Sequence, residues 1–235
     1  MNAFELSVLI QPAALIFCVT FAVGFYVLRN PGAAIVVASL KTFIYIIYFG
    51  WIFDGSITFS DDWSYLYRGQ VLYSAGIRFF NVFDIIQYWD FMRNVAGGEH
   101  FIYYLYNCYA IGLFGYGYYA PVALNIVLTA VIALLGVKIV SKEFRLSRSL
   151  ANLFFLFLLF HPDIVAWSTI TNLKDTLVLT LHVILLYGIS CFFNNRYRTA
   201  FTAISISIAI LLQIRFYVPL MFLAAFILLI SIQKK

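Results

Sequence analysis

Long apolar runs separated by short polar breaks dominate the chain. A helix that crosses the hydrocarbon core of a bilayer needs about 20 apolar residues, and several runs approach or reach that length. Asn30-Pro31-Gly32 ends the first run, because proline and glycine interrupt helices. The run over 200–233 is too long for one span, and the segment 214–219, which contains Arg215 and Pro219, divides it. The pattern predicts seven membrane spans: residues 7–29, 33–53, 119–140, 150–170, 176–193, 200–214 and 217–233.

Residues 101–118 are apolar but rich in tyrosine, which prefers the membrane–water interface. The distribution of basic residues along the chain indicates whether this segment crosses the membrane. Nine of them lie in four clusters: Arg29; Lys138, Lys142, Arg145 and Arg148; Arg196 and Arg198; Lys234 and Lys235. If 101–118 does not span, all four clusters fall on one side, as the enrichment of Lys and Arg in cytoplasmic loops requires. We therefore expect one membrane domain over residues 1–235, with an external N-terminus, a cytoplasmic C-terminus and an external juxtamembrane segment, 54–118, between the second and third spans.

Composition narrows the class of protein. The 235 residues are 64% hydrophobic and 11% charged, with a mean hydropathy of +0.95, whereas soluble domains are about 45–50% apolar and about 25% charged. This excludes a water-soluble domain, a disordered chain and a nucleic-acid binder. It predicts an all-α polytopic membrane protein, which we expect in the bacterial inner (cytoplasmic) membrane. Cys18, Cys108 and Cys191 lie far apart in apolar surroundings and are expected to be small buried hydrophobic residues.

The external segment carries six of the ten acidic residues. Ser60-Asp61-Asp62 places a favoured N-cap before two carboxylates, which suit the start of a helix. The aromatic and apolar residues that follow, among them Trp63 and Leu66, recur near helical spacing. This predicts an amphipathic helix on the outer membrane surface. Two more such helices are expected, one from Asp84 to Trp89 and one over 101–115.

Asp61 and Asp62 admit two interpretations. Either they cap this surface helix, or one of them is a catalytic base or metal ligand at the mouth of a membrane cavity, since adjacent carboxylates raise each other's pKa. The order of the later motifs favours the second interpretation. After the pair come Phe114-Gly115, a span of small residues, the basic loop 138–148, His161-Pro162-Asp163 and Asn172-Leu173-Lys174-Asp175.

This order resembles the N-terminal half of the GT-C superfamily of membrane glycosyltransferases, which includes the protein O-mannosyltransferase and aminoarabinose-transferase families. The matching features are Asp61-Asp62 with Tyr65, Phe114-Gly115, the basic loop, Pro162 and Asp175, over roughly residues 35–190. The chain departs from the family in two respects. It has two spans before the acidic segment instead of the usual one, and it is shorter than most members.

The resemblance implies a sugar transfer from a polyprenyl-phosphate-linked donor to an acceptor on the outer side of the membrane. Asp61, Asp62 and Asp175 are the candidate catalytic residues, with Asp163 as an alternative second acid. The candidate substrate-binding residues are Tyr65, His161, Asp163, Lys174 and Arg215, of which the two cations would hold the lipid phosphate as it leaves. A divalent cation stays open as a cofactor, because relatives differ in metal dependence.

Two other classes of function stay open. A non-catalytic GT-C-like subunit or scaffold would keep the fold and depend on a partner membrane subunit. A small transporter or flippase is disfavoured, because no inverted repeat is visible and most ionisable groups lie near the outer surface. Within the spans, we expect Lys41 to snorkel toward the inner surface and His182 to hydrogen-bond a neighbouring helix.

Overall fold

The computed structural model describes residues 4–78, 89–96 and 100–233, and within them every regular element is a helix. Five helices are long and apolar enough to cross a membrane. They are α1 (Leu6–Leu28), α2 (Pro31–Ile47) with its π-helical extension η1 (Tyr48–Ile52), α7 (Tyr119–Glu143), α10 (Asp175–Phe193) and α11 (Tyr197–Ile214). The chain is thus a helical protein with the features of a multi-pass membrane protein, and these five elements agree closely with predicted spans.

The two remaining predicted spans differ from simple helices. The predicted span 150–170 is a bent pair, α8 (Arg148–Phe160) and α9 (Pro162–Thr169), with an angle of 42° between them, and counting it gives six spans. The chain bends at His161 because Pro162 cannot donate a backbone hydrogen bond and begins a new helix. α12 (Tyr217–Gln233) has 17 residues, and its passage through the membrane stays a prediction.

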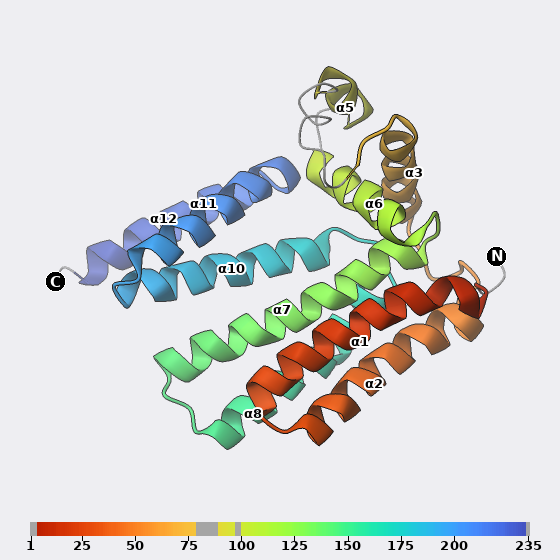
Figure 1. The fold of residues 1–235 in the computed structure, drawn as a ribbon. Helices are drawn as coiled ribbons and strands as arrows, with labels where there is room; N and C mark the ends of the chain where they lie inside the picture. Colours follow the sequence, from red (N-terminus) through yellow and green to blue (C-terminus); the bar gives the residue numbers. More distant parts are fainter. Residues whose placement is uncertain (1–3, 79–88, 97–99, 234–235) are drawn as a thin grey trace.

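α7 is the central helix of the bundle and packs against α1, α6, α8, α9 and α10 (Figure 1). Its buried face is rich in small residues, including Ala123, Ala130 and Ala133. Small side chains let apolar helices approach closely. α1 and α2 form one antiparallel pair beside α7, and α10 and α11 form another.

α3 (Ser60–Ser74) and α6 (Phe101–Phe114) pack against each other at the end of the bundle where α7 begins (Figure 1). Gly69 makes this close packing possible, because a Cβ atom there would lie 2.6 Å from the Cβ of Asn107. α6 has 14 residues, fewer than a span needs. α5 (Trp89–Ala96) lies near this pair. Residues 84–88 of the expected second amphipathic helix lie outside the described residues.

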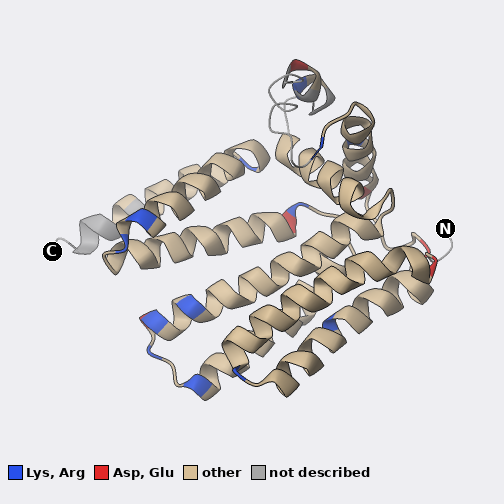
Figure 2. Cartoon of the chain, in the orientation of Figure 1, with Lys and Arg blue, Asp and Glu red and all other residues tan. Residues whose placement is uncertain are grey.

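The two ends of the bundle differ in charge: basic residues predominate at one end, whereas the other end carries both acidic and basic residues (Figure 2). At one end, Arg148 donates to the Leu28 carbonyl over 3.3 Å, and Asn194 donates to Glu143 over 3.1 Å, so the ends of α1, α7, α8 and α10 meet there. This basic end holds three of the four basic clusters; the fourth, Lys234-Lys235, is outside the described residues. The other end holds the described acidic residues apart from Glu143. Which end faces the cytoplasm stays a prediction from the charge rule.

Lys41 does not snorkel, contrary to our expectation. Its side chain is 1% exposed, and its Nζ donates to the Leu159 carbonyl over 2.8 Å. Because α8 ends at Phe160, its last carbonyls lack partners within the helix. Lys41 satisfies one of them at the bend between α8 and α9.

Two smaller expectations also need correction. Cys18 is exposed, whereas Cys108 and Cys191 are buried. The buried residues of α1 form a stripe that includes Ile16 and Thr20, and Cys18 lies off that stripe. Ser60 is the first residue of α3 rather than its cap; the Asp62 carboxylate instead accepts from the backbone N–H of Phe59 over 3.3 Å.

The arrangement of charges predicts the accessibility of introduced cysteines. In a variant without the three native cysteines, Ser56→Cys at the acidic end should react with an impermeant thiol reagent added outside intact cells, and Arg145→Cys should react only after permeabilisation. The reason is that basic loops stay cytoplasmic. External labelling at position 145 with protection at position 56 would show that the bundle is inserted the other way round.

Candidate functional site

A cavity of about 760 Å³ lies at the acidic end of the bundle. Its walls come from the start of α3, from α7, α9 and α10, and from the break between α11 and α12. Its polar and charged lining comprises Ser60, Asp61, Tyr65, Asp163, Lys174, Asp175, Thr176 and Arg215; its apolar lining comprises Phe59, Ile132, Ile164, Trp167, Leu173 and Leu179. Segments separated by more than 150 residues in the sequence therefore meet around one space.

Six of the eight predicted site residues line this cavity: Asp61, Tyr65, Asp163, Lys174, Asp175 and Arg215. Asp62 and His161 do not. The ring of His161 lies 3.8 Å from the Asp163 carboxylate, next to the cavity wall. The fold thus brings the two predicted acids Asp61 and Asp175 to one cavity.

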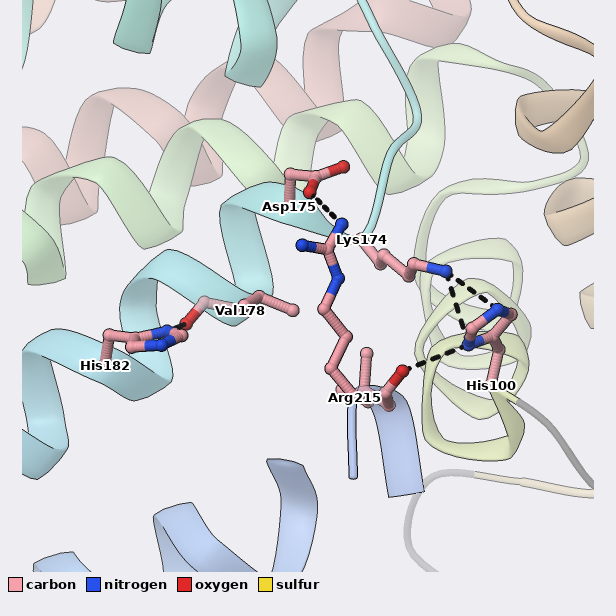
Figure 3. Close-up of polar contacts among 7 residues, drawn as sticks. His100, Lys174, Asp175, Val178, His182 and Arg215 are labelled. Carbon is pink, nitrogen blue, oxygen red and sulfur yellow. Dashed lines mark hydrogen bonds and ion pairs between the residues drawn. The ribbon is translucent and has the colours of Figure 1, made fainter. Parts of the chain in front are cut away.

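Arg215 and Asp175 form an ion pair across the cavity wall. The guanidinium donates to Asp175 Oδ1 over 2.5 Å (Figure 3). Asp175 is the first residue of α10, where a carboxylate suits the helix dipole, and Arg215 lies in the break that the sequence predicted between α11 and α12. The side chains are 32% and 41% exposed. A ligand can therefore reach the guanidinium without unfolding the site.

Lys174 has a different partner, His100, which precedes α6 (Figure 3). His100 Nδ1 lies 3.2 Å from the Ile214 carbonyl, which only accepts, so we assign the ring proton to Nδ1. Nε2 then accepts from the Lys174 ammonium over 2.7 Å. The ammonium also lies 5.6 Å from the centre of the Tyr65 ring. Sequence reasoning missed His100, because a single histidine before an aromatic helix carries no motif.

A smaller cavity of about 360 Å³ adjoins the first one. Lys174 and Arg215 line both cavities. The other residues that line the smaller cavity are His100, Leu212, Gln213, Ile214, Phe216 and Tyr217. The two cations therefore separate two spaces and are accessible from each.

Asp62 is buried beside the site rather than in it. Its Oδ2 accepts from the Tyr118 hydroxyl and from the Phe59 N–H, while Oδ1 has no hydrogen-bond partner among the described residues. Burial raises the pKa of this carboxyl group, and the hydrogen bond from Tyr118 opposes that effect. The arrangement suits a structural carboxyl group more than one that contacts a substrate.

The Asp62 network joins three parts of the fold. Asn172, in the loop between α9 and α10, donates its backbone N–H to the Tyr118 hydroxyl over 3.0 Å and its side-chain amide to the Asp62 carbonyl over 3.1 Å. The Tyr103 hydroxyl donates to the Asn172 side chain over 2.9 Å. α3, α6 and the start of α7 are thereby fixed to the loop that carries Lys174.

Phe59 and Trp167 form an aromatic wall that the sequence analysis did not identify. Their rings are stacked with centroids 6.2 Å apart and 12° between planes, and the two residues are 49% and 47% exposed. Such aromatic faces offer a flat apolar surface to a ring-shaped ligand. The signal was missed because Phe59 and Trp167 are more than 100 residues apart and aromatic residues occur throughout the chain.

Metal-ligating side chains do not cluster among the described residues. Within the described ranges, no three His, Cys, Asp or Glu side chains are grouped closely enough to hold one, and Asp175 is paired with Arg215. His182 is likewise no ligand in such a group: its Nδ1 bonds to the Val178 carbonyl of its own helix over 2.7 Å (Figure 3), rather than to a neighbouring helix as expected.

The Asp62 network predicts a difference between the two adjacent acids. Asp62→Ala should lower the free energy of unfolding by about 1–3 kcal/mol, because it leaves the Tyr118 hydroxyl and the Phe59 N–H without their acceptor. Asp61→Ala is the matched control and should cost much less, since Asp61 is exposed. Thermal unfolding of the purified protein in detergent measures both. Equal losses would contradict the structural role of Asp62.

Comparison with models of known families, with curated proteins and with solved structures finds no match to this chain.

Proposed function

We propose that this protein is a membrane glycosyltransferase that moves a sugar from a polyprenyl-phosphate-linked donor to an acceptor on the outer side of the membrane. The observation that carries the proposal is one cavity in which acids, cations and exposed aromatic rings meet at the end of an apolar helix bundle. The GT-C-like order of motifs in the sequence supports the same proposal.

Arg215 and Lys174 would hold the phosphate of the donor. A guanidinium forms paired hydrogen bonds to phosphate oxygens and stays charged at any relevant pH. Asp175 orients Arg215 and His100 orients Lys174. Both cations would then stabilise the negative charge on the lipid phosphate as it leaves.

Asp61 is the best placed general base. It is exposed and lines the cavity near Tyr65. An acceptor hydroxyl would give its proton to the Asp61 carboxylate and attack the anomeric carbon of the sugar, while the bond from that carbon to the phosphate oxygen breaks. The bonding electrons leave with the lipid phosphate, next to Arg215 and Lys174.

The rest of the cavity suits the two other parts of the donor. Phe59 and Trp167 present flat faces on which a sugar ring can pack. Ile132 and Leu179 extend the wall along α7 and α10, toward the depth at which a polyprenyl chain would lie. The smaller cavity beyond the two cations offers a separate route for the acceptor.

A non-catalytic subunit or scaffold is the alternative, with a partner membrane subunit providing the catalysis. Transfer by the purified chain from a defined polyprenyl-phosphate sugar to an acceptor distinguishes the two. Donor binding without any transfer, in the absence of other proteins, would favour the scaffold. A transporter would instead move the donor across proteoliposome membranes without cleaving it.

Asp61→Asn should abolish most of the transfer. Loss of a general base typically costs about 10²–10⁴ in rate, while the amide keeps the size of the side chain. The measurement is kcat with a saturating donor, with Ser60→Ala at the adjacent lining position as the control. Full activity of Asp61→Asn would remove Asp61 from the mechanism and leave it as a residue of the first helical turn.

Arg215→Lys should weaken donor use partially, and Arg215→Ala should weaken it severely. Lysine keeps the charge but loses the paired hydrogen bonds to phosphate. A donor titration measures KM and kcat for both variants, and expression level serves as the folding control. If the lysine variant equals the parent at every donor concentration, Arg215 is an interfacial anchor, because either side chain can snorkel.

A further inference from the structure

A separate cavity of about 420 Å³ lies at the basic end of the bundle, between α1, α7 and α8. We infer that this cavity binds the phosphate headgroup of an anionic phospholipid. It lies toward the opposite end of α7 from the acidic cavity, and the inference does not depend on the proposed glycosyl transfer.

Three cations from different segments line this cavity: Arg29, Lys138 and Arg148. Arg29 ends α1 in a left-handed conformation, Lys138 is in the last third of α7, and Arg148 begins α8. Arg148 is fixed by its 3.3 Å hydrogen bond to the Leu28 carbonyl. The Lys138 ammonium lies 5.2 Å from the centre of the Tyr26 ring. The fold, rather than the local sequence, brings these charges together.

The lining of the cavity contains no acidic side chain. Ser141 and Asn152 add polar groups that can hydrogen-bond to an anion. The nearest acid along α7, Glu143, accepts hydrogen bonds from Ser190 in α10 and from Asn194 at the end of α10. Its carboxylate is thus engaged on the side of α7 that faces α10. Among the described residues none of the three cations forms an ion pair. Their positive charge is therefore available to a bound anion.

The start of α8 adds to this positive field. Ser147 caps the helix by accepting from the Leu150 N–H over 3.4 Å. The N-terminus of a helix carries a partial positive charge and favours phosphate. Arg148, the first residue of the helix, places a full charge at the same point.

An apolar groove shows what kind of phosphate compound fits. A second space of about 310 Å³ is lined only by Leu146, Leu150, Leu153, Phe154 and Phe157. Leu146 also lines the basic cavity, so the two spaces adjoin. From Leu150 to Phe157 the groove follows α8 for roughly 10 Å at the rise of an α-helix, away from the basic end. A phospholipid has this combination of a charged head and an apolar chain, whereas a soluble phosphate compound needs only the first.

The inference can be tested by native mass spectrometry of the delipidated full chain in detergent, titrated with phosphatidylglycerol, phosphatidylcholine or glycerol 3-phosphate. We expect phosphatidylglycerol to bind at least about tenfold more tightly than the other two. Lys138→Gln and Arg148→Gln should each weaken phosphatidylglycerol binding about fivefold, the effect typical of one basic residue at an anionic lipid surface. Leu153→Ser should also weaken it, by shortening the apolar contact.

Lys142→Gln and Arg198→Gln are the matched controls, because both lie at the basic end but outside the cavity lining. They should leave binding unchanged, and thermal unfolding should show that all variants are folded. If the controls weaken binding as much as the cavity variants do, a diffuse positive surface attracts the lipid and the inferred site is wrong. If glycerol 3-phosphate binds as tightly as phosphatidylglycerol, the cavity takes a soluble phosphate compound and the lipid assignment is wrong.

Discussion

The acidic end of this protein depends on one buried carboxyl group. Asp62 is fully buried and accepts hydrogen bonds from Tyr118 and from the backbone of Phe59. Both donors reach Oδ2, and a buried carboxyl group without them would be costly, so the start of α3 and the start of α7 must stay together. Asn172 extends this constraint to the loop before α10. The helices outside the spans are thereby held in a fixed position relative to the bundle.

The buried hydrogen-bond network around Asp62 holds the cavity-lining residues in place, although those residues do not belong to the network. Asn172 lies two residues before Lys174 and three before Asp175, and Asp62 follows Asp61 directly. In each of these two segments, one residue is buried in the network and its near neighbours line the cavity. Asp62 is buried beside Asp61, and Asn172 is buried close to Lys174 and Asp175. A loop of polar residues alone would leave Lys174 and Asp175 mobile. Here the buried amide and carboxyl groups limit that motion, which preorganises the proposed phosphate site.

The sequence predicted five of the seven spans closely, because each of these depends on a local property. An apolar run, a Pro-Gly break or a capped start such as Asn30 is visible within a few residues, and Asn30 does cap α2 by accepting from the Ala33 N–H. Within 101–118, α6 has 14 residues, fewer than a span of full length needs, while the orientation that the charge rule assigns stays a prediction. The sequence did not show contacts between residues that are far apart in the chain. These contacts are His100 beside Lys174, Phe59 stacked on Trp167, and Lys41 at the end of α8. Nor could the sequence distinguish Asp61 from Asp62, because adjacent residues of a helix point about 100° apart and the packing around the helix decides which of the two side chains is buried.

The hydrogen bond from Lys41 to the Leu159 carbonyl also bears on how the chain enters the membrane. The two residues are 118 positions apart, so at a synthesis rate of about 5–20 residues per second the lysine emerges roughly 6–24 s before its acceptor. During that interval no carbonyl of α8 exists to receive its ammonium group, and a charge in the bilayer core is costly. Before α8 is made, the Lys41 ammonium therefore needs another partner, such as the water at the membrane interface that its long side chain can reach. The buried position of Lys41 is reached only once the end of α8 has packed beside α2.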